Sequence, residues 1–204
     1  MPLSLVGSEM FIRDRFKLGL FENRTVDLNA IKDKVFTTEH QQVALETAQK
    51  GIVLLKNKGL LPLEKTTSKK RILVTGPNAN NQTILGDWHA AQPEENVITI
   101  FEGLKHVGNQ NGYEVEFFDS GENIRKIKDK AIETAAQKAK DFDYAIVVVG
   151  DNSMRYRWKD KTAGENMGRA ALDLPGKQLA LVKAIKATGT PVIIVLVNGR
   201  PISE

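Results

Sequence analysis

Residues 144–150 read Tyr-Ala-Ile-Val-Val-Val-Gly, an unbroken apolar run rich in β-branched residues. Such a run is typical of a strand buried on both faces, as in a parallel sheet with helices above and below. About twenty mostly polar residues follow, and residues 172–178, Leu-Asp-Leu-Pro-Gly-Lys-Gln, then lead into a helix. The apolar residues of that helix, Leu179, Val182 and Ile185, are spaced for one face. This stretch therefore predicts a buried strand, a long loop and a helix.

The predicted loop is far longer than the usual two to six residues between a strand and a helix. It is also unusually rich in charged residues: Arg155, Arg157, Lys159, Asp160, Lys161, Glu165 and Arg169. Open α/β sheets bind their ligands in loops at the carboxyl ends of their strands. The loop is therefore the first place to look for a functional site.

Strands and helices alternate from residue 72 onward, which predicts a mainly parallel sheet between two helix layers. The fold class expected is α/β, a three-layer αβα sandwich of flavodoxin-like type. Residues 113–117 alternate apolar and charged side chains, so this strand is expected near an edge. The other predicted strands are 52–55, 72–74, 144–149 and 191–197. The other predicted helices are 38–50, 99–108 and 123–140. Thr38 is expected to cap the first of these helices and Thr99 the second.

Two overlong loops, 76–97 and 150–174, leave the carboxyl ends of predicted strands. Because parallel strands end at the same edge of a sheet, both loops should lie on one rim. The side chains expected together on this rim are Asp87, Trp88, Asp151, Arg155, Glu165 and Arg169.

The composition of the 204 residues, with 41% hydrophobic and 26% charged residues, fits one ordinary soluble domain, with or without a flanking segment. The net charge of +4 comes from scattered lysines and arginines, so nucleic-acid binding is not expected. No cysteine is present, and the three histidines are far apart, which argues against a metal site. No glycine-rich phosphate fingerprint follows a strand, so no cofactor is expected. The apolar runs are too short to span a membrane.

The two ends of the chain have expectations of their own. Residues 1–15 show neither helical nor strand periodicity, and residues 4–10 resemble translated sequencing-adaptor read-through, so this segment is expected to be non-native or disordered. The sequence stops just after the strand at 191–197. The sheet is therefore expected to be incomplete at the C-terminus, with an unpaired apolar edge and poor solubility of the isolated chain.

Several short motifs follow one another along the chain: residues 16–23 (FKLGLFEN), 40–46 (HQQVALE), 51–57 (GIVLLKN), 60–63 (LLPL), 74–79 (VTGPNA), 86–88 (GDW), 164–178 around Gly-Glu, Arg169 and Leu-Asp-Leu-Pro, and 198–201 (NGRP). In this order they resemble the second domain of family 3 glycoside hydrolases, the β-glucosidase class. The resemblance covers about residues 16–204; 16–37 resembles a linker that leaves an N-terminal barrel, and 38–204 resembles part of the α/β sandwich domain.

The resemblance implies retaining hydrolysis of a β-linked sugar, such as a glucoside or xyloside, bound between a barrel and this sandwich. A barrel aspartate would be the nucleophile, and Glu165 matches the general acid/base, which must lie about 5–5.5 Å from it. Trp88 matches an aromatic position lining the leaving-group subsite, and Arg169 would orient Glu165 or contact sugar. Asp87 and Arg155 complete the candidate substrate-binding residues. Because no barrel lies in this chain, it should be inactive alone.

Two positions depart from the family pattern, and simpler interpretations remain open. Gly168 stands where the family usually has an aspartate before Arg169, and Arg24 replaces a common proline. Glu165 and Arg155 could be solvated loop residues, Trp88 could pack the loop on the sheet, and Asp87 could cap a turn. The main alternative function is a non-catalytic flavodoxin-like module that binds a carbohydrate or nucleotide; a third is a domain that only completes another chain's pocket. The sequence leaves the sugar, the linkage, the compartment and the oligomeric state open.

Overall fold

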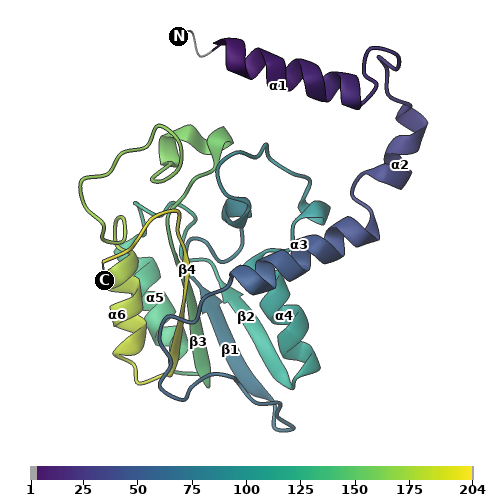
Figure 1. Ribbon diagram of the computed structural model, residues 1–204. Coiled ribbons are helices and arrows are strands. Elements are labelled where there is room, and N and C mark those ends of the chain that lie inside the picture. The colour runs from purple at the N-terminus through teal and green to yellow at the C-terminus, as the bar shows by residue number, and fades with distance from the viewer. Residues whose placement is uncertain (1–3, 204) are drawn as a thin grey trace. The chain divides into compact units, whose positions relative to one another are not determined.

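The computed structural model describes residues 4–203, and the side chains of residues 11–203 (Figure 1). The chain divides into two compact units, residues 1–57 and 58–204, and each is described by itself. Within the described residues, no helix has the length and apolar character needed to cross a membrane.

The first unit consists of helices without a buried core. It contains α1 (Ser4–Lys17), a 3₁₀ turn (Leu28–Ala30), α2 (Ile31–Lys34) and α3 (Thr38–Gly51), and none of its described side chains is buried. Helix α1 was not expected, because the sequence of residues 1–15 has no helical periodicity. The predicted non-native origin of residues 1–15 stays a prediction, and residues 1–3 lie outside the described part.

Two predictions in the first unit are wrong. The N-cap of α3 is Thr37 rather than Thr38: the Thr37 backbone is extended and its hydroxyl accepts a hydrogen bond from the His40 amide at 3.3 Å. Residues 52–55 form no strand, and their side chains are 63–79% exposed. A strand needs a neighbour for its backbone hydrogen bonds, and every strand pair among the described residues lies within the second unit.

The second unit is built on a parallel sheet, as predicted, and the described residues form four of the five strands expected from the sequence. The strands are β1 (Lys70–Thr75), β2 (Tyr113–Phe118), β3 (Tyr144–Gly150) and β4 (Val192–Val197), in the order β2-β1-β3-β4. Ile72 of β1 is paired with Tyr144 of β3, and Ala145 of β3 with Val192 of β4. Strand β2 lies at one edge, as its alternating pattern predicts, and β4 lies at the other.

Helices cover both faces of the sheet, which makes the three-layer sandwich. Figure 1 shows α5 (Asp129–Ala139) and α6 (Gln178–Lys186) together on one face and α4 (Ile100–Gln110) on the other. Alternate residues of β3 point to opposite faces: Val147 belongs to the core cluster under α5 and α6, and Val148 to the cluster under α4. This alternation explains why the whole strand is apolar.

The sequence predicted the start of one helix correctly and the start of another wrongly. Thr99 and Glu102 form the predicted capping box, each side chain accepting a hydrogen bond from the backbone amide of the other, at 3.2 and 2.8 Å. Helix α5 begins at Asp129 rather than at the predicted residue 123. Ile124 and Ile127 are buried as predicted, but from a loop rather than from a helix.

Candidate functional site

The two long loops meet at the carboxyl ends of β1 and β3, on the rim predicted from the sequence. The contact is made by hydrogen bonds to the two carboxylate oxygens of Asp87, from loop 76–97. The amide of Glu165 donates to Asp87 Oδ2 at 2.5 Å, and Lys161 Nζ donates to Asp87 Oδ1 at 2.8 Å. Strands β1 and β3 are also the neighbours between which the strand order reverses, the usual place for a ligand site in this kind of sheet.

The end of β3 is fixed to the start of α6 by Gln178. This side chain is fully buried; its oxygen accepts from the Gly150 amide and its nitrogen donates to the Gly150 carbonyl, both at 2.9 Å. Gly150 has a φ of 143°, and a Cβ there would lie 2.7 Å from the carbonyl carbon of Val197 on β4. The long loop therefore leaves the sheet from a rigid point.

Glu165 lies on the same rim as Trp88. Its side chain is 46% exposed, and its Oε2 forms an ion pair with Nη2 of Arg155. The carboxylate is therefore accessible from solvent rather than buried in a structural ion pair. Trp88 itself is 76% exposed, and the Arg155 guanidinium carbon lies 3.6 Å from the centre of the indole ring. Arg155 thus links the acidic and the aromatic candidate residues.

Asp87 is the residue on which this loop contact depends. Besides the bonds from Lys161 and Glu165, its Oδ1 lies 3.3 Å from Nε of Arg155 in a further ion pair. The hydrogen bond from Lys161, and then that from the Glu165 amide, lower the pKa of the Asp87 carboxyl below its ordinary value of 3.8. Asp87 is therefore an ionised residue that joins the two loops. Its predicted sugar contact stays a prediction.

Arg169 is held by Asp151 and by the backbone of Ala171. Its Nη1 donates to Asp151 Oδ1 at 2.8 Å, and its Nε donates to the carbonyl of Ala171. Asp151 is 2% exposed and also accepts a hydrogen bond from the Thr162 hydroxyl at 2.9 Å. Gly168 offers no carboxylate next to Arg169, and the carboxylate paired with Arg169 is that of Asp151. Asp151 thus holds the loop, and a sugar contact by Arg169 stays a prediction.

The residue that sequence reasoning missed is Lys161. Its side chain is fully buried, and its ammonium lies 4.6 Å from the centre of the Trp158 ring. Its neighbours Lys159 and Asp160 gave it the appearance of a solvated residue, so no sequence signal marked it. By contrast, Arg157 behaves as an ordinary loop cation and forms ion pairs with Glu122 and Asp160.

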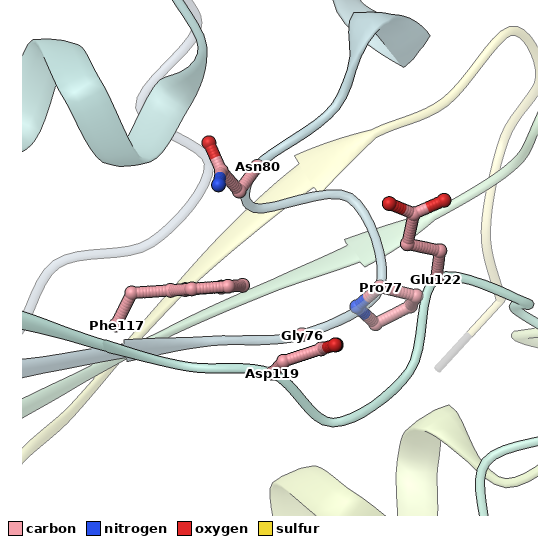
Figure 2. Close-up of a pocket in the computed structure, with 6 residues that line it drawn as sticks. All are labelled: Gly76, Pro77, Asn80, Phe117, Asp119 and Glu122. Atoms are coloured by element: carbon pink, nitrogen blue, oxygen red, sulfur yellow. The ribbon is translucent and has the colours of Figure 1, made fainter.

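A small cavity lies beside the ends of β1 and β2 (Figure 2). Its volume is about 160 Å³, well below the roughly 300–1,000 Å³ of typical small-molecule sites. Figure 2 shows the carboxylates of Asp119 and Glu122 on its border, and Glu165 and Trp88 do not line it. Within residues 4–203, no cluster of three or more His, Asp or Glu side chains could hold a metal ion.

Together, the three-layer sandwich and the two long loops that meet where the strand order reverses define an open-sheet α/β domain with a ligand-binding rim. Residues 52–204 match the family described as "Glycosyl hydrolase family 3 C-terminal domain", and the chain belongs to this family.

Among curated relatives, the chain is 36% identical to a β-xylosidase of Formosa agariphila, with 93% of this chain and 26% of the relative covered. It is 32% identical to a periplasmic β-glucosidase of Salmonella typhimurium, with 91% of this chain and 25% of that relative covered. The chain thus spans about a quarter of the length of these relatives.

Solved structures show the same likeness. A β-glucosidase involved in saponin metabolism from intestinal bacteria superposes with a TM-score of 0.78 at 30% identity, over 92% of this chain and 28% of that one. A β-glucosidase from Listeria innocua in complex with glucose gives a TM-score of 0.76 at 29% identity, over 92% of this chain and 24% of that one. These comparisons confirm the predicted family and fold class.

Proposed function

We propose that this chain is the second domain of a retaining β-glycosidase and that Glu165 is its general acid/base. The single observation that carries the proposal is the position of Glu165: a solvent-accessible carboxylate on the rim where β1 and β3 end, beside the exposed ring of Trp88. The curated relatives that support it are a β-xylosidase and a β-glucosidase.

In this proposal, Glu165 protonates the leaving oxygen in the first step and deprotonates water in the second. In the structure the Glu165 carboxylate is paired with Arg155. Arg155 and Trp88 then line the leaving-group side, where the apolar face of a sugar ring packs against the indole.

The other reacting carboxylate would come from an N-terminal barrel domain in the same polypeptide, which we call the parent protein. Residues 16–37 would form the linker between the barrel and the sandwich domain, residues 38–204. The substrate would be a β-linked glucoside or xyloside. Because hydrolysis with retention needs two carboxyl groups about 5–5.5 Å apart, we expect no turnover by the 204-residue chain alone.

The test is Glu165→Ala in the parent protein, with kcat/KM measured on glycosides with poor and with good leaving groups. We expect a loss of about 10²–10⁴-fold for a poor leaving group, which needs protonation, and a much smaller loss for a dinitrophenyl glycoside. Glu95→Ala, which removes an exposed carboxylate from the neighbouring loop, is the control and should hydrolyse both normally. Unchanged hydrolysis of a natural disaccharide by Glu165→Ala would refute the assignment.

One observation favours a second candidate, the non-catalytic binding module. Trp88 is 76% exposed within this chain, which is unusual for a tryptophan that only packs a loop. A module of this kind would bind a sugar or nucleotide without the barrel. Titrating the 204-residue chain with ligand while following tryptophan fluorescence separates the two functions, because quenching that disappears in Trp88→Ala is expected only for the module.

A further inference from the structure

Lys161 is a buried cation in a loop whose other cations reach solvent. Its side chain is 0% exposed, whereas those of Arg155 and Arg157 are 28% and 30% exposed. An ammonium removed from water is costly unless nearby groups compensate its charge. The compensation here comes from Asp87 Oδ1 at 2.8 Å, from the carbonyl of Glu165 at 3.3 Å, and from the ring of Trp158.

These contacts hold the peptide groups on both sides of Glu165. The Glu165 amide donates to Asp87 Oδ2, and the Glu165 carbonyl accepts from Lys161 Nζ. Lys161 also binds the other oxygen of Asp87, so the same ammonium fixes the carboxylate that receives the amide. The backbone of Glu165 is therefore restrained at both ends, while its side chain, paired with Arg155, remains 46% exposed to solvent.

We propose that Lys161 is a positioning residue for Glu165: it fixes the Glu165 backbone directly and through Asp87, and so sets where the acid/base carboxyl lies. This inference rests on the proposed function of Glu165. It adds a residue that acts on the reaction without touching the substrate, because its ammonium is sealed from solvent.

Arg155 and Lys161 share the carboxylate of Asp87, so removing Lys161 also affects Arg155. Asp87 Oδ1 is shared between Lys161 at 2.8 Å and Arg155 Nε at 3.3 Å, and the same Arg155 binds the Glu165 carboxylate. If the ammonium is removed, Arg155 is the cation left beside Asp87. The guanidinium is then drawn towards Asp87. Glu165 loses the hydrogen bond from Lys161 to its carbonyl, and its ion pair with Arg155 is weakened.

The test is Lys161→Met in the parent protein, compared with Lys159→Met, which removes an exposed cation two residues away. Because kcat/KM reports the first step, in which the leaving oxygen is protonated, we expect a loss of about 10- to 100-fold for a poor leaving group. The loss on a dinitrophenyl glycoside should be small, Lys159→Met should resemble the unaltered protein, and Lys161→Arg should recover part of the activity.

A merely structural role gives a different result. Loss of folded enzyme would lower kcat/KM by the same factor for both leaving groups, and that outcome, or no loss at all, would overturn the inference. If Lys161→Met does not fold, Asp87→Asn should produce the same dependence on the leaving group, and its absence there would also overturn the inference. Failure of the proposed function is distinguishable, because Glu165→Ala would then have no leaving-group dependence either.

Discussion

Gly164 shows how closely the two loops approach each other at the level of single residues. Its φ is +93°, and a Cβ at this position would lie 2.7 Å from Cγ of Asp87. That carbon belongs to the carboxylate that accepts the hydrogen bond from the Glu165 amide. A side chain there would have to push Asp87 away from the Glu165 amide. The glycine before Glu165 is thus needed for the loop contact itself.

We therefore predict that Gly164→Ala lowers both stability and activity. The positive φ and the displaced Asp87 should cost about 1–3 kcal/mol in unfolding free energy, with a loss of kcat/KM on poor leaving groups. Gly168→Ala is the matched control, since a Cβ added there would meet no atom within 4 Å and the φ of Gly168 is not positive. Thermal unfolding and kinetics of the two variants of the parent protein measure the difference; equal behaviour would contradict the role of Gly164.

The charge of Asp87 predicts a pH dependence. Because its pKa is lowered in the folded protein, the carboxylate contributes stability above pH 3.8, and that contribution is lost as the pH falls through the lowered pKa. Asp87→Asn should therefore lower the melting temperature near neutral pH, and the gap to the unaltered protein should narrow below pH 3.8. Calorimetry from neutral pH to below pH 3.8 tests whether this gap narrows in acid, with Asp173→Asn at an exposed position as the control. A gap that widens in acid would be opposite to the prediction.

Single residues also mark where sequence reasoning stops at the site. Asp87, Trp88 and Glu165 were expected on one rim because strand ends of a parallel sheet coincide, and the structure places them there. The burial of Lys161 could not be predicted, because burial of a lysine depends on a carboxylate 74 residues away. Likewise, Gly168 left the partner of Arg169 open, and only the fold brings Asp151 to it.

At the scale of elements, the join between β3 and α6 positions the long loop. Gln178 occupies both backbone hydrogen-bonding groups of Gly150 from a fully buried position. Replacing its amide by an apolar group leaves these buried groups without partners, and each unsatisfied group costs about 1–3 kcal/mol.

We predict that Gln178→Leu destabilises the second unit and speeds amide exchange in residues 150–174. Gln137→Leu, at an exposed position of α5, is the matched control and should change neither. Hydrogen–deuterium exchange on the parent protein measures both effects locally. Unchanged exchange in the loop after Gln178→Leu would show that the join does not hold it.

Elements were predictable where a local pattern decides their state. The apolar runs of β1 and β3 were found because a strand covered on both faces has apolar side chains throughout. Strand β4 was found from the same kind of run, although it is less buried. The run at 52–55 has the same composition but no strand beside it among the described residues, and a sequence pattern does not supply a partner. The spacing of Ile124 and Ile127 fits a helix, yet both are buried from an irregular loop.

At the scale of the whole molecule, the sheet has an apolar edge. Among the described residues β4 pairs only with β3, and Ile194 in its middle is 50% exposed. Exposed apolar edge strands are templates for pairing with another chain.

We predict that the 204-residue chain self-associates through β4 and that Ile194→Lys reduces this association. Ile98→Lys changes a more exposed isoleucine outside the strands, and serves as the control. Sedimentation velocity over a range of concentrations measures the effect. A chain that stays monomeric throughout and melts cooperatively would contradict the prediction.

The most direct test of the account is the product that Glu165→Ala forms in azide. In a retaining β-glycosidase without its acid/base, azide can enter the vacated space and attack the glycosyl-enzyme intermediate. The account predicts faster turnover of a dinitrophenyl glycoside in azide, with a β-glycosyl azide as the product. An α-glycosyl azide would identify Glu165 as the nucleophile instead, and no azide product with unchanged hydrolysis would show that Glu165 takes no part in the reaction.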